Sequence, residues 1–279
     1  MIYYFDTSAL NYLHDDPEVA NITAGLTATN TIWITSLNVI EAGITNNAER
    51  RISLLKLQKQ LARDIRPLQL PNLLLRESAV AYATRKDRRD LSIGKNQNGI
   101  WIALNNPEKI DDAARQELYR WKKELEDTFK RTHESGRAQF QKLFESKEKR
   151  PRNAAALLRH YSLNEGFLFD VTADIYEKAT GAKLKREELF SFFRSTPQWP
   201  FFFLGWAYAI YARAIQKEKY GGNNAGNVDI WCATYLPSCD IFVTADAAQF
   251  RALRLINKFN QRPCKVLRYS ELRQQLVIN

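Results

Sequence analysis

The chain has 279 residues, with 41 Lys and Arg against 31 Asp and Glu, which gives a formal net charge of +10 at pH 7. Its 45% hydrophobic and 26% charged residues are ordinary for a globular protein and exclude bulk disorder. The positive surplus favours a polyanionic partner such as RNA or DNA.

The three cysteines form no CxxC pair and have no histidine at metal-ligand spacing, so the chain offers no zinc site, and a reducing compartment is indicated. A strand pattern begins at residue 2, which leaves no space for a leader peptide. The longest apolar run, residues 199–212, contains Pro200 and Gly205 and is too short to cross a bilayer, so it predicts a buried helix. We therefore expect a soluble cytoplasmic protein without a membrane partner.

The first predicted element is a buried strand, Ile2 to Phe5, which runs directly into Asp6. Asp6, Thr7 or Ser8 could simply cap the helix that follows. Ligands of open α/β sheets bind beyond the carboxyl ends of the strands, so Asp6 is also a candidate site residue. After this helix, His14 precedes two acids and Pro17, a pattern that predicts a turn rather than a metal site.

A second strand is predicted from Thr31 to Thr35, followed by a helix that Ser36 could cap. Glu41 lies beside the apolar stripe of this helix, either in a site or at the solvent margin. An amphipathic helix and another helix after a proline complete the first 85 residues.

From about residue 86 the sequence becomes polar, and residues 115–159 contain thirteen Lys and Arg against seven Asp and Glu. Apolar residues at helical spacing predict a long helix: Leu118, Trp121, Leu125 and Phe129. We hypothesise that basic residues between them contact phosphates, the alternative being a solvated helix face. These residues are Lys122, Lys123, Lys130 and Arg131.

The last eighty residues return to alternating strands and helices. A glycine-rich loop leads into a helix that Asn227 could cap, with Asp229 in its first turn. A strand then ends in Thr244 and Asp246, and a further strand and helix follow it. This alternation predicts a mainly parallel sheet.

Four acids thus lie at strand exits or helix starts: Asp6, Glu41, Asp229 and Asp246. Each alone has a simpler explanation as a capping or first-turn residue. If the strands are parallel, however, the four carboxylates meet at one sheet edge, where their repulsion requires protons or a cation. Oxygen ligands suit Mg²⁺ or Mn²⁺, which can activate water to attack a phosphodiester.

In YYFDTSAL, SLNVIEAGI and NVDIWCATYLPSCDIFVTADAAQF, this order of acids resembles the PIN domain nucleases, including toxin ribonucleases of the VapC type. The resemblance implies a three-layer α/β/α sandwich formed by residues 1–85 and 201–279, with residues 86–200 as a basic, mostly helical insertion. It also implies an Mg²⁺- or Mn²⁺-dependent endoribonuclease, in which Asp6, Asp229 and Asp246 hold metal. Glu41 would orient or deprotonate water, and Ser8 and Thr244 would be supporting residues.

Several alternatives remain open. A phosphatase with an aspartyl nucleophile needs a second Asp two residues after the first, where this chain has Ser8, and the glycine-rich loop lacks the GK[ST] of a phosphate loop. A structure-specific DNA nuclease with a helical arch would carry further acids. An inactive PIN-like RNA-binding or interaction module would not need all four. An antitoxin or other inhibitor protein and a homodimer are partners that the resemblance implies.

Overall fold

The computed structural model describes residues 1–85, 92, 97–144, 151–163, 165–214, 228–260 and 263–277, with the backbone alone at 135–144, 161–163, 165, 167 and 214. Most of the predicted polar segment, residues 86–91 and 93–96, lies outside these residues. The glycine-rich loop at 221–227 lies outside them as well. The strands are β1 (Ile2–Phe5), β2 (Thr31–Trp33), β3 (Ile241–Thr244) and β4 (Lys265–Arg268).

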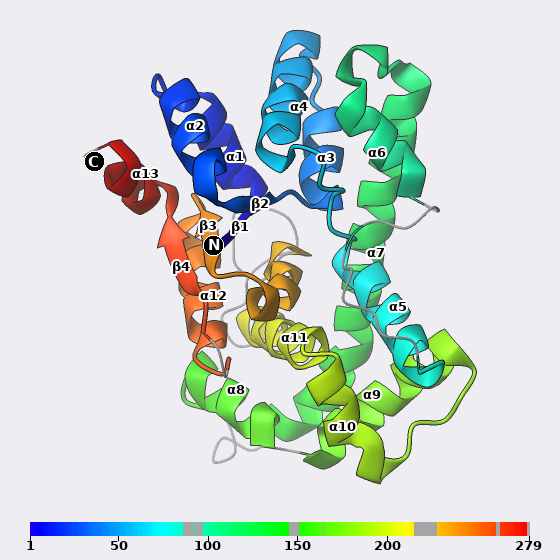
Figure 1. The fold of residues 1–279 in the computed structure, drawn as a ribbon. Helices are drawn as coiled ribbons and strands as arrows, with labels where there is room; N and C mark the ends of the chain where they lie inside the picture. The colour runs from blue at the N-terminus through cyan, green and yellow to red at the C-terminus, as the bar shows by residue number, and fades with distance from the viewer. Residues whose placement is uncertain are drawn as a thin grey trace.

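The helices carry most of the described chain (Figure 1). The first part contains α1 (Thr7–His14), α2 (Val19–Thr29), α3 (Ser36–Gly43), α4 (Ala48–Ala62) and α5 (Pro71–Ala83). The middle part contains α6 (Asn98–Asn105), η2 (Pro107–Lys109), α7 (Asp112–Phe144), α8 (Ala154–Leu163), α9 (Glu165–Thr180), η4 (Arg186–Glu188) and α10 (Leu189–Ser195). The last part contains α11 (Gln198–Ala214), the 3-10 helix η5 (Val228–Ser238), α12 (Ala247–Asn257) and α13 (Tyr269–Val277).

The four strands form one sheet in the order β2-β1-β3-β4, and every neighbouring pair is parallel. This confirms the predicted α/β class with a parallel sheet. Tyr4 of β1 lies opposite Trp33 on one side and Phe242 on the other, so a strand from the N-terminal part of the chain pairs with one from the C-terminal part at the centre of the sheet (Figure 1). The carboxyl ends of β1 and β3 therefore point to the same edge.

The strands are apolar because the sheet is covered by helices. All four residues of β3 are buried, and Tyr4 is fully buried between Tyr235 and Phe242, with ring centroids 5.1 and 4.4 Å away. Aromatic pairs at these distances add to the stability from burial alone. This packing fixes the strand ends that carry the acids.

The helical middle part packs into the same core as the sheet. In α7 the predicted stripe is buried at Leu118, Leu125 and Phe129, while Trp121 is partly exposed. This helix packs against α3 and later against α11, and its apolar side chains join the same hydrophobic cluster as those of β1 and β3 (Figure 1). The predicted insertion is thus in direct contact with the elements that carry the acids.

Two local predictions need correction. The second strand ends at Trp33 instead of Thr35, and Thr35 rather than Ser36 caps α3, because its hydroxyl and the Asn38 side chain form a reciprocal capping box. The Ser36 hydroxyl donates instead to the carbonyl of Leu68, at 2.7 Å. Asp229 lies in the first turn of a helix, as predicted, and this helix is of the 3-10 type.

The buried helix predicted from 199–212 corresponds to α11. Among the described helices, none has the length and apolar character needed to span a membrane. All three cysteines are free thiols in buried positions.

Candidate functional site at the carboxyl edge of the sheet

Asp6 and Asp246 each follow a strand and cap the next helix. Asp6 accepts from the backbone N–H of Ser8 at 3.0 Å, and Oδ1 of Asp246 accepts from the N–H groups of Ala248 and Gln249, both at 2.7 Å. The capping explanation is therefore confirmed for both acids. It does not compete with a site, because capping occupies only part of each carboxylate: no hydrogen bond with a described residue involves Oδ2 of Asp246.

Ser8 joins these two strand ends. Its hydroxyl donates to Oδ2 of Asp6 at 2.5 Å and accepts from the backbone N–H groups of Ala245 and Asp246 at 3.0 and 3.2 Å. The hydroxyl of Thr244 accepts from the N–H of Asp246 at 3.1 Å. The two predicted supporting residues thus lie beside the acids.

Gln249 is a further residue of this network that the sequence analysis did not identify. It is buried, its Oε1 accepts from the Thr244 hydroxyl at 2.6 Å, and its Nε2 donates to the backbone carbonyl of Asp229 at 3.3 Å. A longer contact of 3.5 Å joins Nε2 to Oδ1 of Asp6. Gln249 therefore connects η5 to the ends of β1 and β3.

Asp229 is the least satisfied acid of the set. It is half-buried, and its carboxylate forms no hydrogen bond or ion pair with any described residue. Burial raises its pKa well above the ordinary value, and the charges of Glu41, Asp6 and Asp246 raise it further, against an opposing effect of Lys122. Strongly perturbed carboxyl groups of this kind cluster at functional sites.

The pKa of Asp6 is also raised, but less strongly than that of Asp229. Burial raises its pKa, the hydrogen bond from the Ser8 hydroxyl opposes this, and the charge of Glu41 adds to the increase. Acids from the end of β1, from α3, from η5 and from the end of β3 thus act on one another. The structure brings all four predicted acids to one region.

Glu41 lies in α3 as predicted, but its partner was not predicted. Oε1 of Glu41 forms an ion pair of 3.0 Å with Nζ of Lys122 in α7, and only 20% and 27% of these two side chains remain exposed. Burial alone would lower the pKa of Lys122, but the charge of Glu41 and its hydrogen bond outweigh this effect and raise it. The helical middle part thereby places a cation among the acids.

The chemistry of the acids suits a hard divalent cation, but their arrangement does not yet form a binding site. Among the described residues, no group of three or more His, Cys, Asp or Glu side chains is placed to hold one metal ion. Glu41 is held by Lys122, and one oxygen of Asp246 is used by the helix α12. Binding of one ion by the set would require some of these side chains to move.

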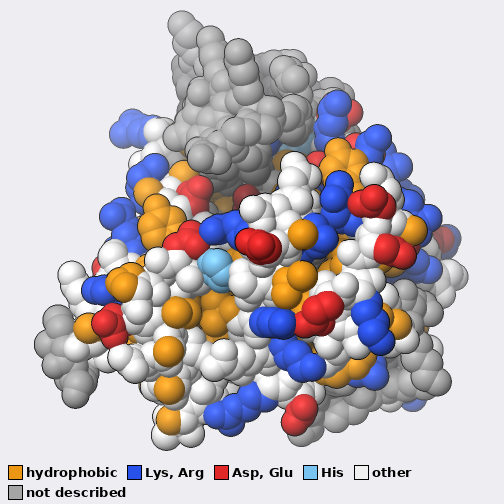
Figure 2. All heavy atoms as spheres, turned by 90° about the horizontal axis from the view of Figure 1, so that it is seen from above, with side chains coloured by type: hydrophobic (Ala, Val, Ile, Leu, Met, Phe, Trp, Pro, Cys, Tyr) orange, Lys and Arg blue, Asp and Glu red, His pale blue; other side chains and the backbone are white. Residues whose placement is uncertain are grey.

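The other basic residues predicted to contact phosphates differ from Lys122. Lys123, Lys130 and Arg131 are exposed, and the Arg131 guanidinium bonds within its own helix to the Asp127 carbonyl at 3.3 Å. Figure 2 shows basic and acidic side chains interspersed on the face that it presents, so the described atoms there form no uniform positive surface. Phosphate contact by these residues stays a prediction.

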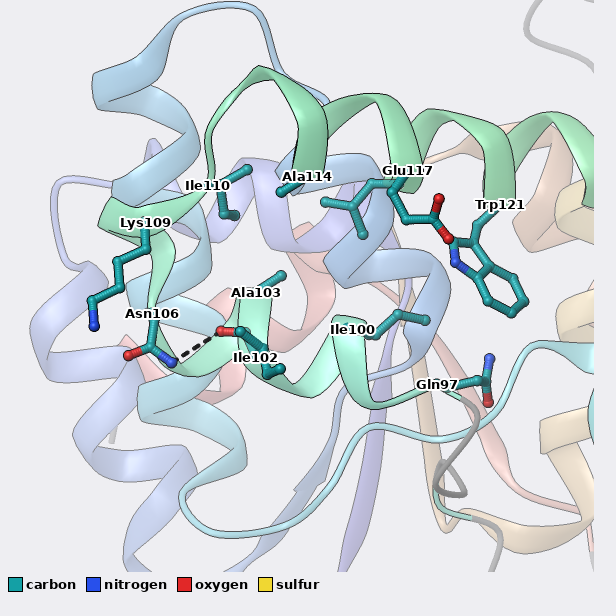
Figure 3. A pocket seen from close by; sticks show the side chains of 12 residues that line it. Gln97, Ile100, Ile102, Ala103, Asn106, Lys109, Ile110, Ala114, Glu117 and Trp121 are labelled. Carbon is teal, nitrogen blue, oxygen red and sulfur yellow. Dashed lines mark hydrogen bonds between the residues drawn. The ribbon is translucent and has the colours of Figure 1, made fainter.

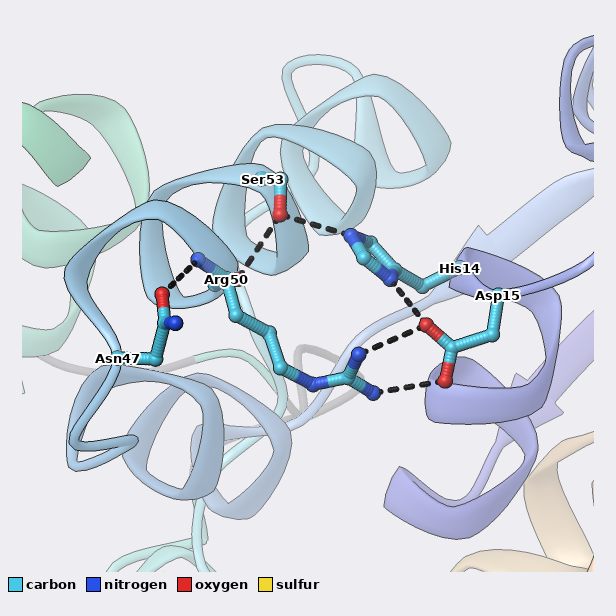
Figure 4. Close-up of polar contacts among 5 residues, drawn as sticks. All are labelled: His14, Asp15, Asn47, Arg50 and Ser53. Atoms are coloured by element: carbon cyan, nitrogen blue, oxygen red, sulfur yellow. Dashed lines mark hydrogen bonds and ion pairs between the residues drawn. The ribbon is translucent and has the colours of Figure 1, made fainter.

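His14 belongs to a structural contact between α1 and α4 (Figure 4). Its Nδ1 lies 2.8 Å from Asp15 and its Nε2 lies 2.7 Å from the Ser53 hydroxyl, while Arg50 pairs with both oxygens of Asp15 at 2.8 Å. Arg50 and His14 lower the pKa of Asp15 to about 2. The contact gives His14 a structural role between the two helices, and Asp15 lies in a turn after α1, as the sequence predicts.

A pocket of about 210 Å³ lies between α6 and α7 (Figure 3). Its wall is mainly apolar, with Leu118 and Trp121 on the α7 side, and Gln97 lies at the end near Trp121. Gln97 is 3% exposed, and neither the nitrogen nor the oxygen of its amide has a hydrogen-bond partner among the described residues. Such a group costs free energy on burial.

Comparisons with protein-family models, with curated proteins and with solved structures find no match to this chain.

Proposed function

We propose that this protein is a divalent-metal-dependent phosphodiesterase, most specifically an endoribonuclease of the PIN type, and that its fold is a PIN-like α/β/α sandwich with a helical insertion. The observation that carries the proposal is the state of Asp229. A half-buried carboxylate that has no hydrogen-bond or ion-pair partner among the described residues, close to three other acids, is costly for stability and is expected only where function requires it.

The proposed chemistry divides between the acids. Asp229 is the best candidate to hold the metal, because its carboxylate has no hydrogen-bond or ion-pair partner among the described residues and a cation would offset the neighbouring charges that raise its pKa. Glu41, which the sequence favours for orienting or deprotonating the attacking water, pairs with Lys122. Ser8, Thr244 and Gln249 hold Asp6 and the end of β3 in place.

Asp6, Asp229 and Asp246, with Glu41 after a change of rotamer, are the residues proposed to hold Mg²⁺ or Mn²⁺. When bound, such an ion would lower the pKa of water and stabilise negative charge on the phosphate. RNA is favoured over DNA by the sequence resemblance alone. The same resemblance favours two protein partners. One is an inhibitor protein that covers the edge of the sheet where the four acids lie, and the other is a second copy of the chain in a homodimer.

The test is cleavage of a mixture of labelled RNA and DNA in the presence of Mn²⁺ or of EDTA. Wild type should cut RNA with Mn²⁺ and not with EDTA, and Asp229→Asn should lose cutting while its free energy of unfolding in EDTA rises. Asp64→Asn is the matched control, since Asp64 is an exposed acid.

Loss of cutting together with a gain in stability separates a catalytic effect from unfolding. If the protein cut DNA but not RNA, the proposed activity would be that of a DNA nuclease and not of a ribonuclease. Cutting that survives EDTA, or that survives Asp229→Asn, would refute the metal-dependent mechanism. No cutting of either nucleic acid would favour a binding module.

A further inference from the structure

Lys122 is held against the acidic edge by packing as well as by charge. Leu118 lies one helical turn before it, is buried, and faces Gly43 of α3, two residues after Glu41. Leu125 and Phe129, later on the same helix, are also buried. These contacts fix α7 beside α3, so the backbone of Lys122 stays near Glu41.

The charge of Lys122 also acts on more than one of the acids. Its ammonium lies 3.0 Å from Glu41 and is close enough to Asp229 for each to influence the other. The positive charge of Lys122 reduces the repulsion among the carboxylates. A divalent cation bound by all four acids would need the Glu41 carboxylate, which is already paired with the lysine. Two cations cannot share one carboxylate at close range without repelling each other.

We propose that Lys122 supplies a positive charge to the acidic edge of the sheet, which is formed by Asp6, Glu41, Asp229 and Asp246. Lys122 pairs with Glu41 while no divalent ion is bound, and it competes with a divalent ion for that carboxylate. The proposal rests on the proposed function in assigning a metal to these acids. The proposal also gives the helical middle part a specific role, because its helix α7 supplies the positive charge that offsets the charges of the acids. Lys122 is thus a positioning residue that acts through Glu41.

The proposal is tested by titrating the full-length protein with Mn²⁺ and measuring free Mn²⁺ by electron paramagnetic resonance. Lys122→Met removes the competing charge and should tighten Mn²⁺ binding on the order of tenfold. Lys122→Arg keeps the charge and should bind Mn²⁺ nearly as wild type does. Lys123→Met makes the same change of net charge at the exposed neighbouring position and should leave the affinity unchanged.

Thermal unfolding in EDTA provides the second readout. Lys122→Met should lower the melting temperature, because Glu41 is then partly buried without a partner, and Mn²⁺ should restore it; a variant that folds only with Mn²⁺ would support the proposal equally. Binding that is equal to or weaker than wild type, or absent in both proteins, would overturn it. These binding results do not depend on cleavage, so a failure of the nuclease proposal would be seen separately.

Discussion

The Ser8 hydroxyl accepts a hydrogen bond from the backbone N–H of Asp246 at 3.2 Å while it donates to the carboxylate of Asp6. One side chain thus ties the exit of the first strand to the exit of the third, although the two lie at opposite ends of the sequence. The geometry of the acidic edge depends on this connection.

Ser8→Ala should therefore weaken both stability and the site. The change removes the donor to Asp6 and leaves the N–H groups of Ala245 and Asp246 without their acceptor, which predicts a loss of about 1–3 kcal/mol in the free energy of unfolding. Urea denaturation measures it, and cutting by the folded variant should fall. Ser53→Ala, which removes a hydroxyl bonded to His14, should leave cutting unchanged. Unaltered cutting by Ser8→Ala would show that the connection is not needed.

Gly43 sets the distance between α3 and α7. A Cβ at this position would lie 2.4 Å from Cδ1 of Leu118, too close without movement of the helix or the side chain. Gly43→Ala should cost about 1–3 kcal/mol of stability, as overpacked cores do. In a Leu118→Ala background the cost should be much smaller, because the space is then free. A double-mutant cycle by urea unfolding measures the coupling, and additive effects would show that the two residues do not constrain each other.

The unpartnered amide of Gln97 predicts a stabilising substitution. Gln97→Leu removes two buried polar atoms that have no partner among the described residues and should raise the free energy of unfolding by about 1 kcal/mol. Gln58→Leu is the control: Gln58 is equally buried and its Oε1 also lacks a partner in the described part of the chain, but its Nε2 donates to the Asn38 carbonyl at 3.2 Å, so this substitution should be less favourable for stability than Gln97→Leu. A loss of stability in Gln97→Leu would mean that the amide has a hydrogen-bond partner in solution.

His133 predicts a pH dependence of stability. Burial, followed by the charge of Arg213, lowers its pKa from 6.5 to about 4, so the folded state holds it neutral. The unfolded chain takes up the proton first as the pH falls. The contribution of His133 is therefore full above 6.5 and is lost as the pH falls from there towards about 4. At about pH 5 this loss is about 2 kcal/mol.

His133→Leu should flatten the dependence of unfolding free energy on pH over this range, as measured by urea denaturation at several pH values. His160→Leu, at an exposed histidine, should keep the wild-type slope. Equal slopes in wild type and His133→Leu would contradict the buried, neutral state of His133.

Short-range patterns in the sequence predicted the parallel sheet and the positions of the acids at strand ends and helix starts. Strands of bulky residues such as Ile2–Phe5 are recognisable locally, and parallel pairing then brings their ends to one edge regardless of loop length. The cap of α3 was missed because the reciprocal partner of Thr35 is an Asn and not the usual Glu or Gln. The position of Asp229 in the first turn of a helix was predicted correctly, but a first-turn acid suits an α-helix and a 3-10 helix equally, so the helix type was not predicted.

The contacts made by α7 could not be predicted. Its apolar stripe showed that the helix packs on something, but no pattern in the sequence specifies that Leu118 faces Gly43 or that Lys122 reaches Glu41. These contacts depend on how a long helix crosses a distant one. Gln249 gave a weak signal, as an Asp followed three residues later by a Gln is typical of a helix start, but its bond to Thr244 comes from the tertiary fold.

The most direct test of one shared cation site is the anomalous scattering of crystals soaked in Mn²⁺. A shared site predicts a Mn²⁺ peak in contact with oxygens of Asp6, Asp229 and Asp246, with Glu41 turned away from Lys122. No peak at the edge of the sheet, or Mn²⁺ bound only to acids elsewhere on the surface, would contradict it.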